Sequence, residues 1–96
     1  MGHCPFEELG DLAGCLDEIR GWPGIRETKP GVFYVKRTPF LHFHVDRDGR
    51  RWADARNGST WREGIDAPRR AAPADRRRFV RAVERCYRAT ARVVGV

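Results

Sequence analysis

Two histidines separated by one residue are the part of this sequence whose types and spacing best suit chemistry. His42 and His44 lie in the alternating segment FLHFHVD. Side chains at positions i and i+2 of a strand point the same way, about 6.5–7 Å apart along it, so both imidazoles could close on one metal ion. Asp46 continues this face, and Asp54 could lie across a hairpin. Two imidazoles and a carboxylate suit zinc or another divalent ion, although a polar, partly solvated sheet face is the plain alternative.

A row of arginines near the C-terminus is the second candidate for function. At 100° per residue, five arginines fall within about a quarter of the circumference of a predicted helix; they are Arg77, Arg81, Arg85, Arg88 and Arg92. Their guanidinium groups could contact successive phosphates of a nucleic acid, or they could form a solvated helix face. Trp52 and Trp61 could stack on bases, but the sequence does not place them on the arginine face.

The cysteines and the single serine form no catalytic motif. Cys15 and Cys86 fall beside or on the apolar faces of predicted helices, where cysteine packs as a small hydrophobe. Ser59 lies in a predicted turn, and the chain contains no GxSxG, HExxH, P-loop or GxGxxG motif. The sequence therefore predicts no enzyme and no cofactor, with zinc or another divalent ion on the histidine face as the alternative.

Length and composition predict one domain, residues 1–96, in a reduced cytoplasmic compartment. Three cysteines without a CxxC pair argue against a disulfide framework. No apolar run approaches the roughly 18–20 residues of a membrane span, and no signal peptide is evident. The net charge of +6 favours an anionic partner. Seventeen of the 19 basic residues are arginine, however, which a GC-rich bacterial genome also produces.

An antiparallel meander is predicted to position these residues. Strict alternation of FLHFHVD places Leu41, Phe43 and Val45 on one face of a strand, and Phe40, His42, His44 and Asp46 on the other. Asp48-Gly49 and Asn57-Gly58 are hairpin turn signals. We expect strands at residues 25–28, 32–37, 40–46 and 51–56, with a short fifth strand around residues 60–61 as an extension. Residues 62–72 are expected to be irregular.

Two amphipathic helices are predicted to flank this sheet. The first begins after Pro5 and shares an apolar face that consists of Phe6, Leu9, Leu12, Ala13, Leu16 and Ile19. The second begins at Pro73, and its apolar side consists of Phe79, Val83, Cys86, Tyr87, Thr90, Val93 and Val94. We expect both helices to cover the sheet face of Phe43. The predicted fold class is therefore α+β, in the order α-β-β-β-β-α or with a fifth strand.

Part of the chain resembles two families of small bacterial domains. The segments WPGIRET and PGVFYVKRTPFLHF resemble the start of MmcQ/YjbR-like domains, and FLHFH before an acidic strand resembles the uncharacterised luciferase-domain family. The similarity covers about residues 12–56. It implies an α+β fold and DNA binding, and it carries no catalytic residues. The chain has Arg37-Thr38-Pro39 where the first family has a Gly-Gly-Lys turn.

The function that these observations favour is a non-enzymatic binding module whose anionic partner is nucleic acid, bound without sequence specificity by the arginine row. The first alternative is a small-ligand or divalent-metal site on the face of His42 and His44. The second alternative is a protein-interaction domain, in which the acidic first helix of one subunit pairs with the basic last helix of another. The sequence contains nothing that favours a membrane partner.

Overall fold

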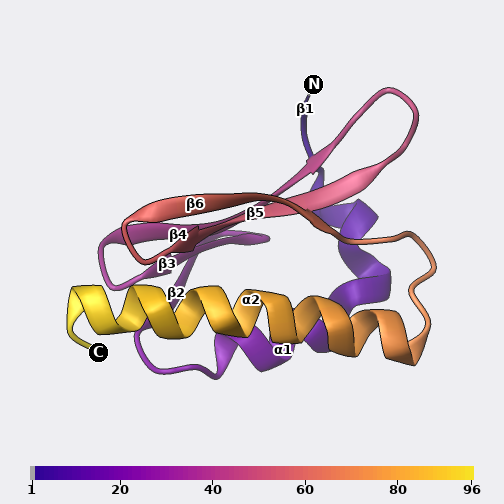
Figure 1. Ribbon diagram of the computed structural model, residues 1–96. Helices are drawn as coiled ribbons and strands as arrows, with labels where there is room; N and C mark the ends of the chain where they lie inside the picture. The colour runs from indigo at the N-terminus through magenta and orange to yellow at the C-terminus, as the bar shows by residue number, and fades with distance from the viewer. Residues whose placement is uncertain (1) are drawn as a thin grey trace.

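The protein folds into two layers, a twisted antiparallel sheet and helices on one of its faces (Figure 1). The computed structural model describes residues 2–96, with side chains from Cys4 onward. The strand order is β2-β3-β4-β5-β6, which consists of Ile25–Lys29, Val32–Val35, Thr38–Val45, Arg51–Asn57 and Thr60–Asp66. The two-residue strand β1 (Gly2–His3) pairs with β4 beyond the end of β3. The predicted α+β meander is confirmed, in its five-stranded form.

Turn chemistry fixes the β4–β5 hairpin, which carries the histidines. One oxygen of the Asp46 carboxylate accepts hydrogen bonds from the backbone N–H groups of Asp48 and Arg50, each at 2.9 Å. Gly49 has φ of 82°, a left-handed conformation that glycine adopts without steric cost. This turn pairs Phe43 of β4 with Ala53 of β5, and so determines which residues of β5 share the histidine face.

A β-bulge at Phe40 overturns part of the predicted alternation. Phe33 pairs with Leu41, whereas Tyr34 pairs with Pro39, so Phe40 is an extra residue in β4. Because a bulge interrupts the alternation of faces, Phe40 is fully buried beside Tyr87, with ring centroids 6.1 Å apart. Its predicted place on the histidine face is therefore wrong.

Strand β6 continues further than the sequence pattern indicates. It runs from Thr60 to Asp66, through residues that were expected to be irregular. A register shift opposite Ala53–Ala55 admits one extra residue into β6, and Gly64 has φ of 75° there. Long polar side chains on an exposed edge strand hide the alternation by which strands are recognised in a sequence.

The N-terminal helical segment changes type part-way along. It consists of a 3-10 helix, η1 (Phe6–Leu12), and an α-helix, α1 (Ala13–Arg20). Residues three apart share a face of a 3-10 helix, and Leu9 and Leu12 are buried on this face. Phe6, at the start of the helix, is nevertheless 45% exposed. Phe6 and Ala13 are both exposed, so the prediction that they lie on the apolar face of one continuous α-helix is wrong. Cys15, which was predicted beside that face, is buried.

Helix α2 (Pro73–Val94) follows the predicted pattern closely. It begins at the predicted proline, and Gly95 ends it with a left-handed φ of 81°. The predicted apolar residues from Phe79 to Thr90 are buried, but Val93 is 62% exposed. None of the helices within residues 2–96 is long and apolar enough to span a membrane.

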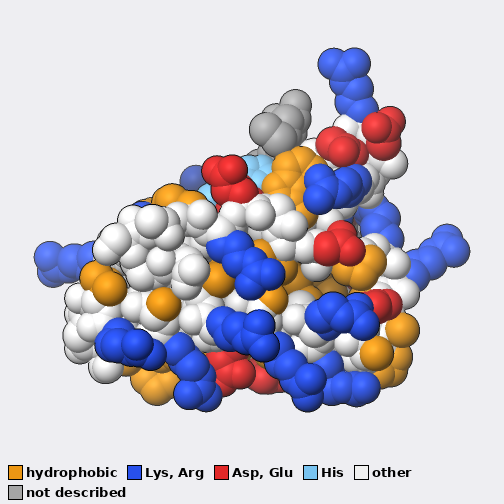
Figure 2. Space-filling model, in the orientation of Figure 1, with side chains coloured by type: hydrophobic (Ala, Val, Ile, Leu, Met, Phe, Trp, Pro, Cys, Tyr) orange, Lys and Arg blue, Asp and Glu red, His pale blue; other side chains and the backbone are white. Residues whose placement is uncertain are grey.

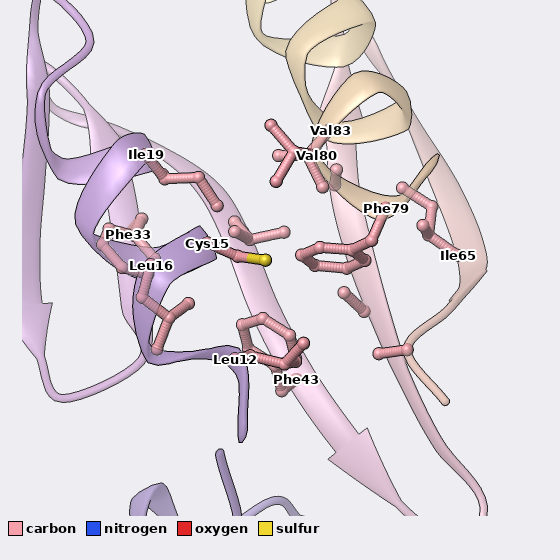
Figure 3. Packing of buried hydrophobic residues seen from close by; sticks show 14 of the residues in the cluster. Leu12, Cys15, Leu16, Ile19, Phe33, Phe43, Ile65, Phe79, Val80 and Val83 are labelled. Carbon is pink, nitrogen blue, oxygen red and sulfur yellow. The ribbon is translucent and has the colours of Figure 1, made fainter. Parts of the chain in front are cut away.

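The hydrophobic core fills the space between the helices and one face of the sheet (Figure 3). Leu12, Cys15, Leu16 and Ile19 approach from the η1–α1 segment, and Phe79, Val80 and Val83 approach from α2. Phe43 of β4 lies against Phe79 with ring centroids 5.7 Å apart. Both helices therefore cover the face of Phe43, as predicted, and leave the histidine face without a helical layer (Figure 1).

One arginine lies inside this core. Arg51 is 2% exposed, and its guanidinium donates to both carboxylate oxygens of Asp11 at 2.8 and 2.9 Å. It also donates to the backbone carbonyls of Glu8, Ala67 and Pro68. The hydrogen bonds between Arg51 and Asp11 lower the pKa of Asp11 to about 2 from 3.8, so the carboxylate stays ionised until strongly acidic pH. Arg51 thereby joins η1, β5 and the segment after β6.

Candidate metal centre

The two histidines and one aspartate meet on the sheet face that no helix covers. His42 and His44 project from β4 on the same side, and Asp54 lies directly opposite His42 in β5. The Oδ2 atom of Asp54 is 3.0 Å from Nε2 of His44 and 3.6 Å from Nε2 of His42. The ligand atoms of the three side chains all lie within 4.8 Å of one another. The predicted position of Asp54 across the hairpin is therefore the observed one.

The two separations between Asp54 and the histidines suit a tetrahedral metal ion. With metal–ligand bonds of 2.0–2.1 Å, two ligands of a tetrahedral zinc lie about 3.3 Å apart. The two aspartate–histidine distances lie on either side of this value. The 3.0 Å contact is also the length of an imidazole N–H hydrogen bond to a carboxylate. A metal ion in this place would replace such a proton, and three protein ligands would leave coordination positions open.

The backbone and the neighbouring strand hold Asp54 in this position. Its Oδ1 atom accepts a hydrogen bond of 3.0 Å from the backbone N–H of Gly64, at the bulge in β6. Its Oδ2 atom is therefore the oxygen that faces both histidines. Contacts of this kind orient metal ligands and raise affinity in known metal sites. No sequence pattern indicates this contact, because the predicted fifth strand covers only residues 60–61 and ends before Gly64.

Two tryptophans flank the imidazoles. The ring of Trp52 stacks on His44 with centroids 5.4 Å apart and an interplanar angle of 28°. Trp61 lies 5.4 Å from His42, and the two imidazoles contact each other edge to face at 4.7 Å. These rings restrict the histidine side chains to the arrangement that brings both Nε2 atoms to Asp54.

An arginine lies over the ring of each tryptophan. The guanidinium of Arg50 lies 4.9 Å from the centre of the Trp52 ring, and that of Arg56 lies 4.8 Å from the centre of the Trp61 ring. Arg56 is itself fixed by a 2.7 Å hydrogen bond to the carbonyl of Pro39. Because each indole already contacts an arginine and a histidine, the two tryptophans are better placed to support the triad than to stack on nucleic-acid bases.

The fourth predicted ligand, Asp46, is not part of this cluster. Its carboxylate closes the β4–β5 turn, and the triad of histidines and carboxylate that the structure brings together within residues 2–96 contains Asp54 instead. Asp46 continues the alternation of β4, but it lies where the strand ends and the turn begins. The backbone of His3 pairs with His44 in the β1–β4 ladder.

The arginine row lies on the other side of the molecule, along α2 (Figure 2). All five predicted residues are exposed; they are Arg77, Arg81, Arg85, Arg88 and Arg92. Among residues 2–96, the one ion pair within this row joins Arg88 to Glu84 at 3.0 Å. A groove of about 410 Å³ between β6 and α2 is lined by three of these arginines together with Arg62 and Arg78. Sequence reasoning missed that Arg62 and Arg78 extend the row.

The aromatic and basic candidates therefore do not form one surface. Trp52 and Trp61 contact the histidines, on the sheet face opposite the helices, whereas the arginine row lies on the outer side of α2. Cys15 and Cys86 are buried, as expected for small hydrophobes, and burial raises the pKa of both thiols.

The chain matches no protein-family model, no curated protein and no solved structure. The resemblance to MmcQ/YjbR-like and luciferase-domain families therefore stays a prediction, as does the DNA binding that it implies. Any functional conclusion must come from the arrangement of the side chains themselves.

Proposed function

We propose that this protein binds a divalent transition-metal ion, zinc in the first instance, through His42, His44 and Asp54. The observation that carries this proposal is the convergence of three ligand atoms within 4.8 Å on a sheet face without a helical cover. Two imidazoles and one carboxylate form a donor set that zinc and neighbouring divalent metals accept readily. The side chains of the triad are 34%, 21% and 16% exposed, respectively, so an ion can reach them from solvent.

Zinc is expected to raise the melting temperature, because an ion that binds only the native state stabilises it by mass action. A free zinc concentration about 100 times the dissociation constant corresponds to about 2.7 kcal/mol. For a domain of this size, that is a rise of roughly 10–20 °C. Differential scanning fluorimetry with and without an excess of ZnCl₂ measures the rise, and EDTA should reverse it.

Matched variants test whether the zinc-dependent rise in melting temperature comes from the triad. The double variant His42→Ala, His44→Ala should show no zinc-dependent rise, and Asp54→Asn should show a much smaller one, since an amide can keep the Gly64 contact but is a poor metal ligand. Asp46→Asn, an acid removed from the same hairpin, should behave like the wild type. A wild-type protein insensitive to zinc, or an undiminished rise in the double variant, would rule out this proposal.

The arginine row supports a second candidate function, binding of nucleic acid through its phosphates. Its residues, from Arg77 to Arg92, extend over about 22 Å of helix, and a duplex presents one phosphate per roughly 1.7 Å of its axis. The row and its groove offer seven guanidinium groups, and two of them are ion-paired within the described residues, Arg88 with Glu84 and Arg78 with Asp75. Guanidinium contacts to phosphates carry no sequence information, so binding would be non-specific.

Binding of a DNA duplex is expected to weaken steeply with salt. Four phosphate contacts predict a log–log slope near −3.6, and Arg81→Gln with Arg85→Gln should reduce its magnitude by about 1.8. Fluorescence anisotropy at several salt concentrations measures both slopes. The control is Arg26→Gln with Arg37→Gln, which removes the same charge from exposed sites outside α2. If low salt gives no binding, or if both double variants change the slope equally, this candidate function is wrong.

A further inference from the structure

A hollow of about 420 Å³ opens beside the proposed metal site. Its lining includes Val32 and Tyr34 of β3, Pro39 and His42 of β4, and Lys29 at the end of β2. His42 therefore belongs both to the metal-ligand cluster and to the wall of this hollow. Ligand sites of proteins commonly have volumes of about 300–1,000 Å³, so the hollow is large enough for a small organic molecule.

The β-bulge in β4 explains why the sheet face is hollow at this place. Without the bulge, Phe40 would alternate onto the same face as His42. Instead it is fully buried and lies beside Tyr87 of α2. Phe40 still borders the hollow, but it is fully buried on the core side, so the face between Pro39 and His42 lacks the large side chain that regular alternation would place there. Bulges are frequent next to functional sites, where they redirect side chains in this way.

The chemistry of the lining indicates an anion with an apolar body. Val32 and Pro39 offer apolar surface, and Tyr34, a partly exposed lining residue, pairs with Pro39 in the sheet. Lys29, which is exposed, provides a positive charge at the rim. A divalent ion on His42 would provide a second and larger one. A carboxylate is a natural ligand for such an ion.

We infer that the hollow binds a small organic carboxylate whose carboxylate group completes the coordination of the metal ion, while its apolar or aromatic body lies against Val32, Tyr34 and Pro39. This inference rests on the metal site proposed above. It adds to that site a class of ligand and the residues that select it. The protein would then recognise its ligand through metal coordination at one end and shape at the other.

The test uses the cobalt(II)-loaded protein with benzoate as the probe. Visible d–d absorption of cobalt reports a change in its ligands, so saturable binding of benzoate should alter the spectrum. Val32→Phe, which fills the hollow, should weaken the binding of benzoate by about tenfold or more. Lys29→Gln should weaken it by about threefold, as for an exposed charge pair. Both variants should bind cobalt as the wild type does. Arg37→Gln, which removes a charge elsewhere, should leave benzoate binding unchanged.

The outcomes separate this inference from the metal proposal. If cobalt binds but benzoate leaves its spectrum unchanged, or if Val32→Phe and the wild type respond alike, the hollow is not the ligand site and the metal site stands. If inorganic phosphate alters the spectrum and benzoate does not, the apolar lining plays no part and the inference is wrong. If cobalt gives no spectrum of a protein-bound ion, the metal proposal and this inference fail together.

Discussion

Replacing Arg51 with methionine is expected to lower the free energy of unfolding by about 3–5 kcal/mol, one of the two largest effects of a single substitution in this protein. The guanidinium is 2% exposed and donates to Asp11 and to three backbone carbonyls in two other segments. Methionine fills a similar volume, but it leaves the Asp11 carboxylate without its charged partner and the carbonyls without their donors. Urea denaturation of the metal-free protein measures the loss.

A second variant separates the ion pair from the packing. In the double variant Arg51→Met, Asp11→Asn the carboxylate charge is also removed, so part of the lost stability should return. Arg50→Met is the control, since Arg50 precedes it in the chain but is exposed, and we expect its effect to stay within about 1 kcal/mol. If Arg51→Met costs no more than Arg50→Met, the buried network does not hold these segments together.

Phe43→Ala is expected to cost about 3–5 kcal/mol, the usual range for removing a buried aromatic ring. The side chain is 1% exposed, and it packs against Phe79 of α2. His42 is its neighbour in β4, on the opposite face and partly exposed. His42→Ala should therefore cost about 1 kcal/mol or less in metal-free protein. Thermal or urea denaturation of the two variants compares two adjacent residues of one strand. Equal and small effects would show that the register of β4 is wrong.

The alternation of β4 and the turn chemistry were enough to predict the three ligands of the candidate metal site. The pattern FLHFHVD placed both histidines on one face. The Asp48-Gly49 signal indicated the hairpin that brings Asp54 opposite His42. Local preferences of the chain determine these features, so they can be read from a sequence. The arginine row was predictable for the same reason, because a helical period of 3.6 residues determines which residues share a face.

The remaining features depend on tertiary packing. Phe40 lies in a regular alternating pattern, and only its contact with α2 explains why a bulge turns it inward. Arg51 shares the core face of β5 with the buried residues Ala53 and Ala55, but no local rule predicts that a buried arginine will find its partner forty residues away in Asp11. The extension of β6 to Gly64 likewise depends on pairing with β5, whose Asp54 it then fixes. Such contacts cannot be derived from local patterns, because both partners come from distant parts of the chain.

The most direct test of the metal site is a crystal structure of the protein grown with one equivalent of zinc, with diffraction data collected on both sides of the zinc absorption edge. We expect a strong anomalous peak about 2.0–2.2 Å from Nε2 of His42, Nε2 of His44 and Oδ2 of Asp54. The peak should be absent from crystals of the His42→Ala, His44→Ala variant. An anomalous map without a peak between these three side chains, or with zinc bound only elsewhere, would contradict the proposed function.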